Sequence, residues 1–211
     1  MRDPFLMSNI KEVFGHPFFS RKLNLPYSDK LIEEIDKFVT NTPKGWACKC
    51  ESTYETGTSG FDKSLNNRLM MTLAPNIDAM LKHFINSPRQ IPYHLDIWFN
   101  KYYQNQWQEI HNHIRPGILL SGIMLLTDPV KDGGHTVFQN PDNTADAWAR
   151  MFDLNAPGNP NLRKTALSSY YLHGAQKHEL LIFPPYLPHY VAPNLTDTPR
   201  YSLSFNVRQL R

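Results

Sequence analysis

The stretch that decides the fold is residues 181–206, LIFPPYLPHYVAPNLTDTPRYSLSFN, in which a short apolar strand and an alternating strand flank a polar loop. Prolines at 184, 185 and 188 end the first strand and turn the chain away from further pairing. His189 follows the last of them, so we expect its imidazole to be presented rather than buried. The loop APNLTDTP has the composition of a hairpin connection.

The alternating strand RYSLSFNV has two different faces. Successive side chains of a strand point to opposite sides, so one face holds Arg200, Ser202, Ser204 and Asn206 and the other holds apolar residues. The Arg200 guanidinium can bind a carboxylate through two parallel hydrogen bonds, and the Ser202 hydroxyl adds a third donor. The pair therefore indicates a carboxylate site; the alternative is a strand with a half-polar outer face.

The composition is ordinary for a soluble globular protein, with 211 residues, 41% of them hydrophobic and 19% charged. We expect one domain over residues 1–211, with a helical support region in residues 1–90 and the core in residues 91–211. The longest apolar run, residues 118–126, is far shorter than the roughly 20 residues of a membrane span. The N-terminus does not resemble a signal peptide, so we expect a cytoplasmic protein.

The charge distribution and the cysteine content argue against two classes of function, nucleic-acid binding and a cysteine-based zinc site. The formal net charge is +3, but lysines and arginines are scattered along the chain, which gives no support for nucleic-acid binding. Cys48 and Cys50 are too close together for an easy mutual disulfide and too few for a zinc site. We expect free thiols in a reducing compartment.

The periodicity of apolar residues changes along the chain. Residues 5–27 fit one or two edge strands, and Ser28 is a suitable N-cap for an amphipathic helix that follows it. Residues 63–86 predict one long helix, or two helices broken at Pro75. From residue 91 the pattern predicts about eight strands. The fold class is therefore α+β, with the helices packed on one face of an antiparallel sandwich or barrel.

A candidate metal site lies in QEIHNHI, residues 108–114. Residues i and i+2 of a strand share a face, so Glu109, His111 and His113 point the same way. With His189 the two histidines would give three nitrogen ligands and leave positions open for other ligands. Nine histidines in the chain also produce close pairs by chance.

A second pair, His94 and Asp96, has the His-x-carboxylate spacing of a two-histidine, one-carboxylate iron site. Its position argues against it. A metal-binding strand of a jelly roll should soon be followed by the hairpin that leads to a glycine turn, and Gly133-Gly134 lies much nearer to His113 than to Asp96.

Several motifs together resemble the iron(II)/2-oxoglutarate-dependent oxygenases, whose pattern is H-x-[D/E], a distal histidine, and R-x-S. Here these are HNH at 111–113, His189 and RYS at 200–202, supported by KDGGHTVF at 131–138 and ELLIFPPYLPH at 179–189. The chain is most similar to the oxygenases of bacteria and marine phages that carry an H-x-H motif. WFN at 98–100, SGIMLL at 121–126 and VFGHPFF at 13–19 carry that likeness.

The resemblance implies a double-stranded β-helix, which is a cupin-like jelly roll, with the N-terminal helices packed on one sheet. It implies a dioxygenase that uses Fe(II), 2-oxoglutarate and O2, hydroxylates an unidentified substrate, and releases succinate and CO2. The residues assigned to catalysis and metal binding are His111, His113 and His189. Those assigned to the co-substrate are Arg200, Ser202, Asn100 and Tyr102, and Tyr103 lies beside them.

His113 departs from the superfamily pattern, which has a carboxylate at this position. Three hypotheses follow: His113 ligates iron, it stays unbound while water or an anion fills the position, or Glu109 or Asp96 replaces it. A neutral imidazole would leave the iron one unit more positive and strengthen the binding of dianionic 2-oxoglutarate.

The main alternative function is a cupin-like metal-binding module, or a three-histidine dioxygenase that does not use 2-oxoglutarate. The Arg200 and Ser202 pair discriminates between the two, because a plain cupin does not need a carboxylate clamp. The primary substrate would be a peptide or protein side chain or a small metabolite. Loops 41–60 and 141–165, with Trp46, Tyr54 and Trp148, would bind it, unless these aromatic side chains only plug the barrel mouth.

Overall fold

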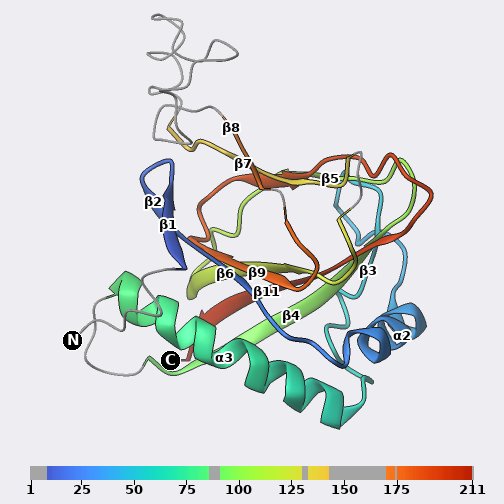
Figure 1. Cartoon of the computed structure of the whole chain (residues 1–211), viewed down its shortest axis with the longest axis horizontal. Helices are drawn as coiled ribbons and strands as arrows, with labels where there is room; N and C mark the ends of the chain where they lie inside the picture. Colours follow the sequence, from blue (N-terminus) through green and yellow to red (C-terminus); the bar gives the residue numbers. More distant parts are fainter. Residues whose placement is uncertain (1–8, 86–90, 130–132, 143–169, 174, 211) are drawn as a thin grey trace, which may run out of the picture.

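Two antiparallel sheets form the body of the protein (Figure 1). The computed structural model describes residues 9–85, 91–129, 133–142, 170–173 and 175–210. The larger sheet has seven strands in the order β1-β2-β9-β6-β11-β4-β3, and the smaller has four in the order β5-β10-β7-β8. The strands are β1 (Ile10–Val13), β2 (His16–Lys22), β3 (Glu51–Ser52), β4 (Tyr93–Tyr102), β5 (Gln108–His111), β6 (Ile118–Leu125), β7 (Thr136–Gln139), β8 (Tyr170–His173), β9 (Glu179–Phe183), β10 (His189–Val191) and β11 (Arg200–Gln209).

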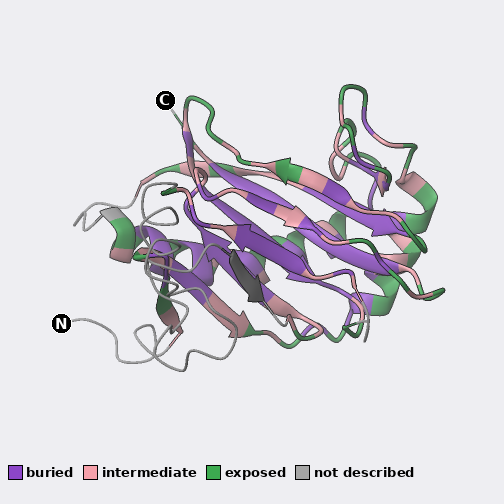
Figure 2. Cartoon of the chain, turned by 90° about the horizontal axis from the view of Figure 1, so that it is seen from above, coloured by how far each residue is buried: buried purple, intermediate pink, exposed green. Residues whose placement is uncertain are grey.

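Strand β11 lies inside the large sheet, next to its middle strand β6, and pairs with β4 over its whole length on its other side. Its alternation is as the sequence predicts. Leu203, Phe205 and Val207 join the main core, whereas Arg200 and Ser202 line a pocket on the opposite face. Figure 2 shows buried stretches running along these strands.

Helix α2 (Ser28–Phe38) packs Leu31 and Ile35 into the main core. Asp29 in its first turn and Lys37 in its last turn suit the helix dipole. The prediction that Ser28 caps the helix is wrong: Tyr27 occupies the cap position without a side-chain cap bond, and the Ser28 hydroxyl donates to Asp29 instead.

Helix α3 (Lys63–Ile85) is continuous through Pro75, which decides between the one-helix and two-helix alternatives. Proline removes one backbone hydrogen bond from the helix. Packing compensates, because Leu73 and Ile77 on either side of the proline are fully buried. Asp62, just before the helix, accepts a hydrogen bond from the backbone N–H of Leu65 and caps the first turn.

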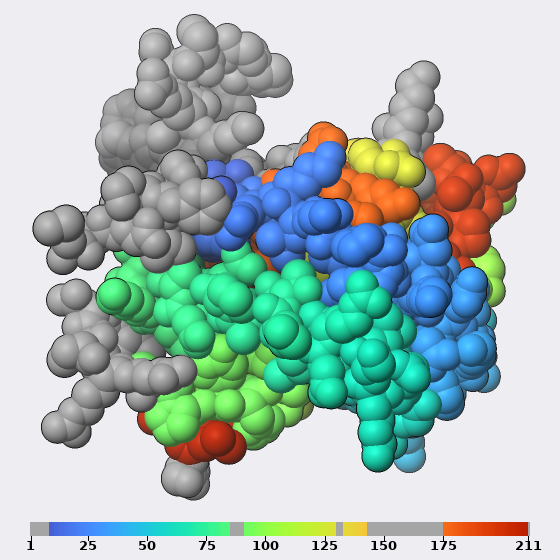
Figure 3. Space-filling view, turned by 60° about the horizontal axis from the view of Figure 1, so that its bottom comes forward, coloured from blue at the N-terminus to red at the C-terminus, as the bar shows by residue number. Residues whose placement is uncertain are grey.

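Both helices cover the same face of the large sheet, and α3, coloured green to teal, lies across the molecule in Figure 3. The expected α+β class with helices on one sheet is therefore confirmed. The first two strands extend this sheet beside β9: β1 pairs with β2, and residues 19–22 of β2 pair with residues 179–182 of β9, far along the chain. The division at residue 90 stays a prediction. Neither described helix is long and apolar enough to cross a membrane.

The second face of the large sheet looks toward the small sheet, and aromatic rings fill one end of the space between them. Phe138 lies edge-on to Phe18 and to Phe183, with ring centroids 5.0 and 4.9 Å apart. These rings belong to a second core of buried residues, distinct from the helix-side core. Elsewhere between the sheets, buried polar side chains such as His189, Arg200 and Ser202 lie among apolar ones.

Candidate active site

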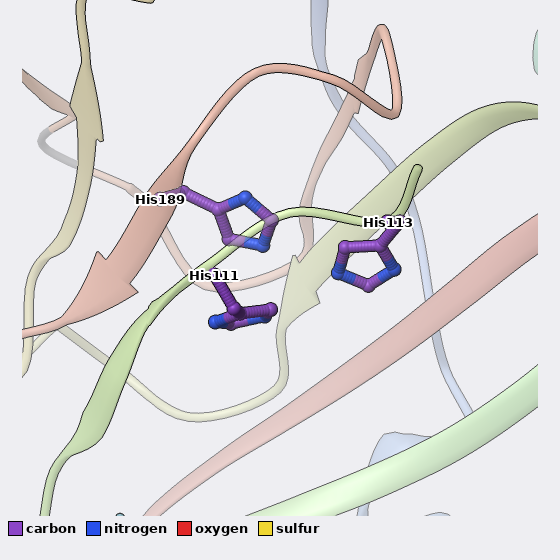
Figure 4. A group of neighbouring side chains, drawn as sticks. All are labelled: His111, His113 and His189. Carbon is purple, nitrogen blue, oxygen red and sulfur yellow. The ribbon is translucent and has the colours of Figure 1, made fainter. Parts of the chain in front are cut away.

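Three histidines meet between the sheets (Figure 4). His111 is the last residue of β5, His113 follows two residues later, and His189 begins β10. Strand pairing sets His189 directly opposite His111. One nitrogen of each imidazole lies within 4.8 Å of the others, so the three rings can share one metal ion. The spacing predicted from the sequence is thus realised in space.

Each of these histidines has its Nδ1 engaged by an oxygen. His111 Nδ1 lies 2.8 Å from the Glu109 carbonyl, His189 Nδ1 lies 3.0 Å from the Leu187 carbonyl, and His113 Nδ1 lies 2.7 Å from Asn206 Oδ1. These contacts leave Nε2 of each ring as the free nitrogen. The Nε2 of His113 is buried and has no hydrogen-bond partner. Metal-binding histidines commonly show this arrangement, in which an oxygen fixes the other nitrogen.

Burial keeps the three imidazoles neutral at pH 7. It lowers the pKa of His111, and it lowers the pKa of His113 to about 4, with a further contribution from His111. The pKa of His189 is also well below its ordinary value, first because of burial and then because of the neighbouring histidines. Neutral imidazole is the form that binds metal, so the electrostatics of the site suit a cation.

The expectation that His189 is presented rather than buried is wrong, since its exposed fraction is 3%. The prolines turn the chain, but β10 then pairs on both sides, with β5 and with β7. The rings of Phe138 and Phe183 also pack against the imidazole, at centroid distances of 5.8 and 5.0 Å. The histidine is therefore aimed at the interior of the site.

Arg200 is a fully enclosed cation, with an exposed fraction of 2%. Its guanidinium donates to Ser202 Oγ at 3.2 Å and to Thr136 Oγ1 at 3.3 Å, and its Nε has no partner. It lies 5.1 Å from the centre of the Tyr102 ring. No carboxylate within the described residues forms an ion pair with it. An arginine stays protonated even when buried, so an anionic ligand would relieve an uncompensated charge here.

A narrow pocket connects the arginine to the histidines. Its wall includes His111, His113, His189, Arg200 and Ser202, together with apolar side chains. A second, roomier pocket adjoins it, since both are lined by Trp98, Gln108, His111 and His113. A ligand with a carboxylate at one end could therefore reach from Arg200 toward the three Nε2 atoms.

Comparison with known proteins agrees with this geometry. The profile of a family described as "Putative 2OG-Fe(II) oxygenase" matches residues 96–206, which is more than half of the chain. The chain belongs to this oxygenase family. The family resemblance predicted from the motifs is thereby confirmed, and with it an enzyme that uses Fe(II), 2-oxoglutarate and O2. No curated protein matches the chain in sequence.

Solved structures share the fold of this oxygenase. A prolyl-4-hydroxylase of Pseudomonas putida superposes with a TM-score of 0.64 at 12% identity, covering 93% of this chain and 94% of that one. A prolyl hydroxylase of Trichoplax adhaerens, solved with a peptide fragment of the hypoxia inducible factor, has a TM-score of 0.59 at 12% identity and covers 90% and 83%. The α-ketoglutarate-dependent epimerase SnoN of nogalamycin biosynthesis gives 0.59 at 14%, covering 90% and 78%. The predicted jelly roll is confirmed.

The other sequence-predicted co-substrate residues of the oxygenase lie at different depths. Tyr102 lines the pocket, and its hydroxyl donates to Gln108 at 2.7 Å. Asn100 is buried but does not line the pocket. Its amide accepts from Ser52 at 2.7 Å and donates to Ser204 at 3.3 Å, so it supports the wall from behind. Tyr103 is 39% exposed.

The alternative carboxylates make other contacts, although Glu109 Oε2 is buried without a hydrogen-bond partner among the described residues. Asp96 forms an ion pair with Arg208 at 2.7 Å and lies 3.2 Å from His94. Glu109 accepts from the backbone N–H of Ala47 at 3.1 Å. Neither belongs to the described group of side chains that could hold a metal, which consists of the three histidines. Of the three hypotheses for position 113, the arrangement favours His113 itself as the ligand.

The sequence did not identify three polar residues that hold the site in place. Thr136 binds Arg200 from the turn motif GGHTVF, while Asn206 and Ser121 bind each other beside His113. A signal was present for each, because Thr136 and Ser121 lie inside quoted motifs and Asn206 lies on the polar face of its strand. Trp148 and most of loop 141–165 fall outside the described residues.

Proposed function

We propose that His111, His113 and His189 hold Fe(II) through their Nε2 atoms, and that Arg200 and Ser202 bind the distal carboxylate of 2-oxoglutarate. The observation that supports this most is the shared pocket onto which the three histidines and the Arg200 guanidinium open, a cation that no carboxylate of the described residues neutralises. A buried cation is costly without a partner, and a dicarboxylate that also reaches the metal would supply one. Three neutral imidazoles would further favour a dianionic ligand.

With these ligands bound, Fe(II), 2-oxoglutarate and O2 supply the oxidising power for hydroxylation of a C–H bond, with release of succinate and CO2. The protein orients the cofactor and keeps water away. Phe183, Ile123 and Val191 make the pocket wall apolar, and Trp98 stacks on His113 at a centroid distance of 5.8 Å. The backbone carbonyls and Asn206 keep Nε2 of each histidine unprotonated.

We propose that the primary substrate enters through the adjoining outer pocket. Trp46, Tyr54 and Trp98 form a continuous aromatic wall there, with ring centroids 5.0 and 5.3 Å apart. Arg115 donates to the Tyr54 hydroxyl and adds a polar edge. Such a wall suits either a peptide side chain or a small metabolite.

The test is an anaerobic titration of metal-free protein with Fe(II) and then 2-oxoglutarate, followed by the visible charge-transfer band of the chelated complex. We expect the band in the wild type and a weaker band in His113→Ala. Arg200→Ala should raise the 2-oxoglutarate concentration that half-saturates the band more than tenfold, because a charge-assisted contact of about 1.5–3 kcal/mol is lost.

Tyr201→Phe is the matched control, because Tyr201 lies on the opposite face of the same strand and its hydroxyl donates to Asp36. It should leave the titration unchanged. Iron binding without a band would instead favour the cupin-like module. An unchanged half-saturating 2-oxoglutarate concentration in Arg200→Ala would contradict the assignment of Arg200 to the distal carboxylate.

A further inference from the structure

His113 differs from the other two site histidines in what holds it. Backbone carbonyls fix His111 and His189, whereas a side chain, the Asn206 amide, fixes His113 at 2.7 Å. A backbone carbonyl is present whatever residue carries it. The orientation of His113 therefore depends on the identity of one residue, 93 positions away in the sequence.

Asn206 is itself held in place by the strand opposite. It pairs in register with Ser121 of β6, and the Ser121 hydroxyl donates to Asn206 Oδ1 at 2.9 Å. Both residues are buried, with exposed fractions of 8% and 1%. The amide oxygen thus accepts from Ser121 and faces His113 Nδ1. An oxygen acceptor requires the proton to be on Nδ1, which leaves the lone pair on Nε2.

We propose that Asn206, supported by Ser121, is the positioning residue that makes His113 a metal ligand. This inference rests on the proposed function, in which His113 ligates Fe(II). Asn206 selects the tautomer, fixes the ring plane, and increases the electron density of the imidazole through its hydrogen bond. It thereby compensates in part for the carboxylate that a histidine at position 113 replaces.

The effect of Asn206 is separable from that of the co-substrate clamp. Arg200 and Asn206 are on the same face of β11, but six residues apart, which is about 20 Å along an extended strand. Asn206 lines the outer pocket and Arg200 lines the inner one. A change at Asn206 should therefore alter metal binding directly, without removing any contact to the distal carboxylate.

The experiment uses Co(II), a paramagnetic stand-in for Fe(II), added to metal-free full-length protein. Two quantities are measured: the Co(II) dissociation constant, and the number of hyperfine-shifted, solvent-exchangeable imidazole N–H signals in the proton NMR spectrum. We expect three such signals in the wild type and two in His113→Ala. Asn206→Ala should lose or displace the His113 signal and weaken Co(II) binding by about 10–100-fold.

Asn206→Asp is the conservative variant, because it keeps the acceptor oxygen and adds a negative charge. It should retain three signals and bind Co(II) at least as tightly as the wild type. Asn76→Ala is the matched control: it deletes another buried amide, one that bonds Arg21 and Thr72 on the helix side. Its Co(II) affinity and its NMR signals should not change, even if its melting temperature falls.

The outcomes separate this inference from the proposed function. A wild type that shows fewer than three imidazole N–H signals would overturn the three-histidine site and the role of Asn206 with it. Three signals in the wild type, with an unchanged spectrum and affinity in Asn206→Ala, would overturn the role of Asn206 alone. So would an Asn206→Asp variant that binds Co(II) as weakly as Asn206→Ala.

Discussion

At the scale of single residues, three neighbours in β6 illustrate how closely the site and the core are interleaved. Ser121 holds Asn206, Gly122 lies opposite Phe205 of the core, and Ile123 lines the pocket. Because the strand alternates, Ser121 and Ile123 point toward the site and the intervening position points toward the helices. In the motif S-G-I, the serine therefore supports Asn206, the glycine leaves room for the Phe205 ring, and the isoleucine forms part of the apolar pocket wall.

The gap at Gly122 predicts the effect of a substitution. A Cβ added at this position would overlap the Phe205 ring, which is fully buried and cannot move aside. Gly122→Ala should reduce the free energy of unfolding by about 1–3 kcal/mol through overpacking, measured by urea denaturation. The same substitution in a Phe205→Leu background should cost less, because the ring is gone. Equal costs in the two backgrounds would mean that the overlap is not the cause.

At the scale of secondary-structure elements, sequence periodicity predicted correctly which side chains share a face of a single strand. The alternation of β11 separated Arg200 and Ser202 from the core residues correctly, and the H-x-H spacing put two imidazoles on one side. The wrong prediction for His189 depended on neighbours distant in sequence. His189 is buried because β10 lies between β5 and β7, and no local pattern states that order. The support of His113 by Asn206 likewise joins residues 93 positions apart, and Ser121 reaches Asn206 only because β11 pairs with β6.

The docking of α2 on the large sheet depends on a polar contact that can be tested. Asp36 accepts from Lys101 Nζ at 2.7 Å and from the Tyr201 hydroxyl at 2.9 Å. Lys101 is largely buried, so Asp36→Ala would leave its ammonium with the Tyr103 and Tyr201 rings but without its carboxylate partner. We expect a loss of about 1–2 kcal/mol in unfolding free energy, at the lower end for a charged hydrogen bond because Asp36 is 43% exposed.

Lys37→Ala is the control for this contact, since it removes an ion pair within the same helix, with Glu34, at the exposed surface. Its urea midpoint should stay close to that of the wild type, and 2-oxoglutarate binding should be unaffected in both variants. If Asp36→Ala were no less stable than Lys37→Ala, the contact would not contribute to docking.

At the scale of the whole molecule, the two faces of the large sheet have different roles. The helices and the outer face of the large sheet form the main core, while its inner face and the small sheet enclose polar and titratable groups. Enclosing three imidazoles between two sheets has a thermodynamic consequence, because a buried imidazole resists protonation. The same burial that prepares the histidines for a metal makes the metal-free protein sensitive to acid.

The stability of the metal-free protein should fall as the pH is lowered from about 6.5 toward 4. The pKa values of His111, His113 and His189 in the folded protein lie below 6.5, and that of His113 is about 4. Over this range the unfolded chain binds more protons than the folded one, so the free energy of unfolding rises with pH. The contribution is complete above pH 6.5 and is lost as the pH falls through the folded values. Urea midpoints measured from pH 4 to 7.5 should therefore rise less steeply in His113→Ala than in the wild type. Carboxylates titrate in the same range in both proteins, so only the difference between the two slopes reports on the site, and equal slopes would show that burial of His113 does not oppose its protonation.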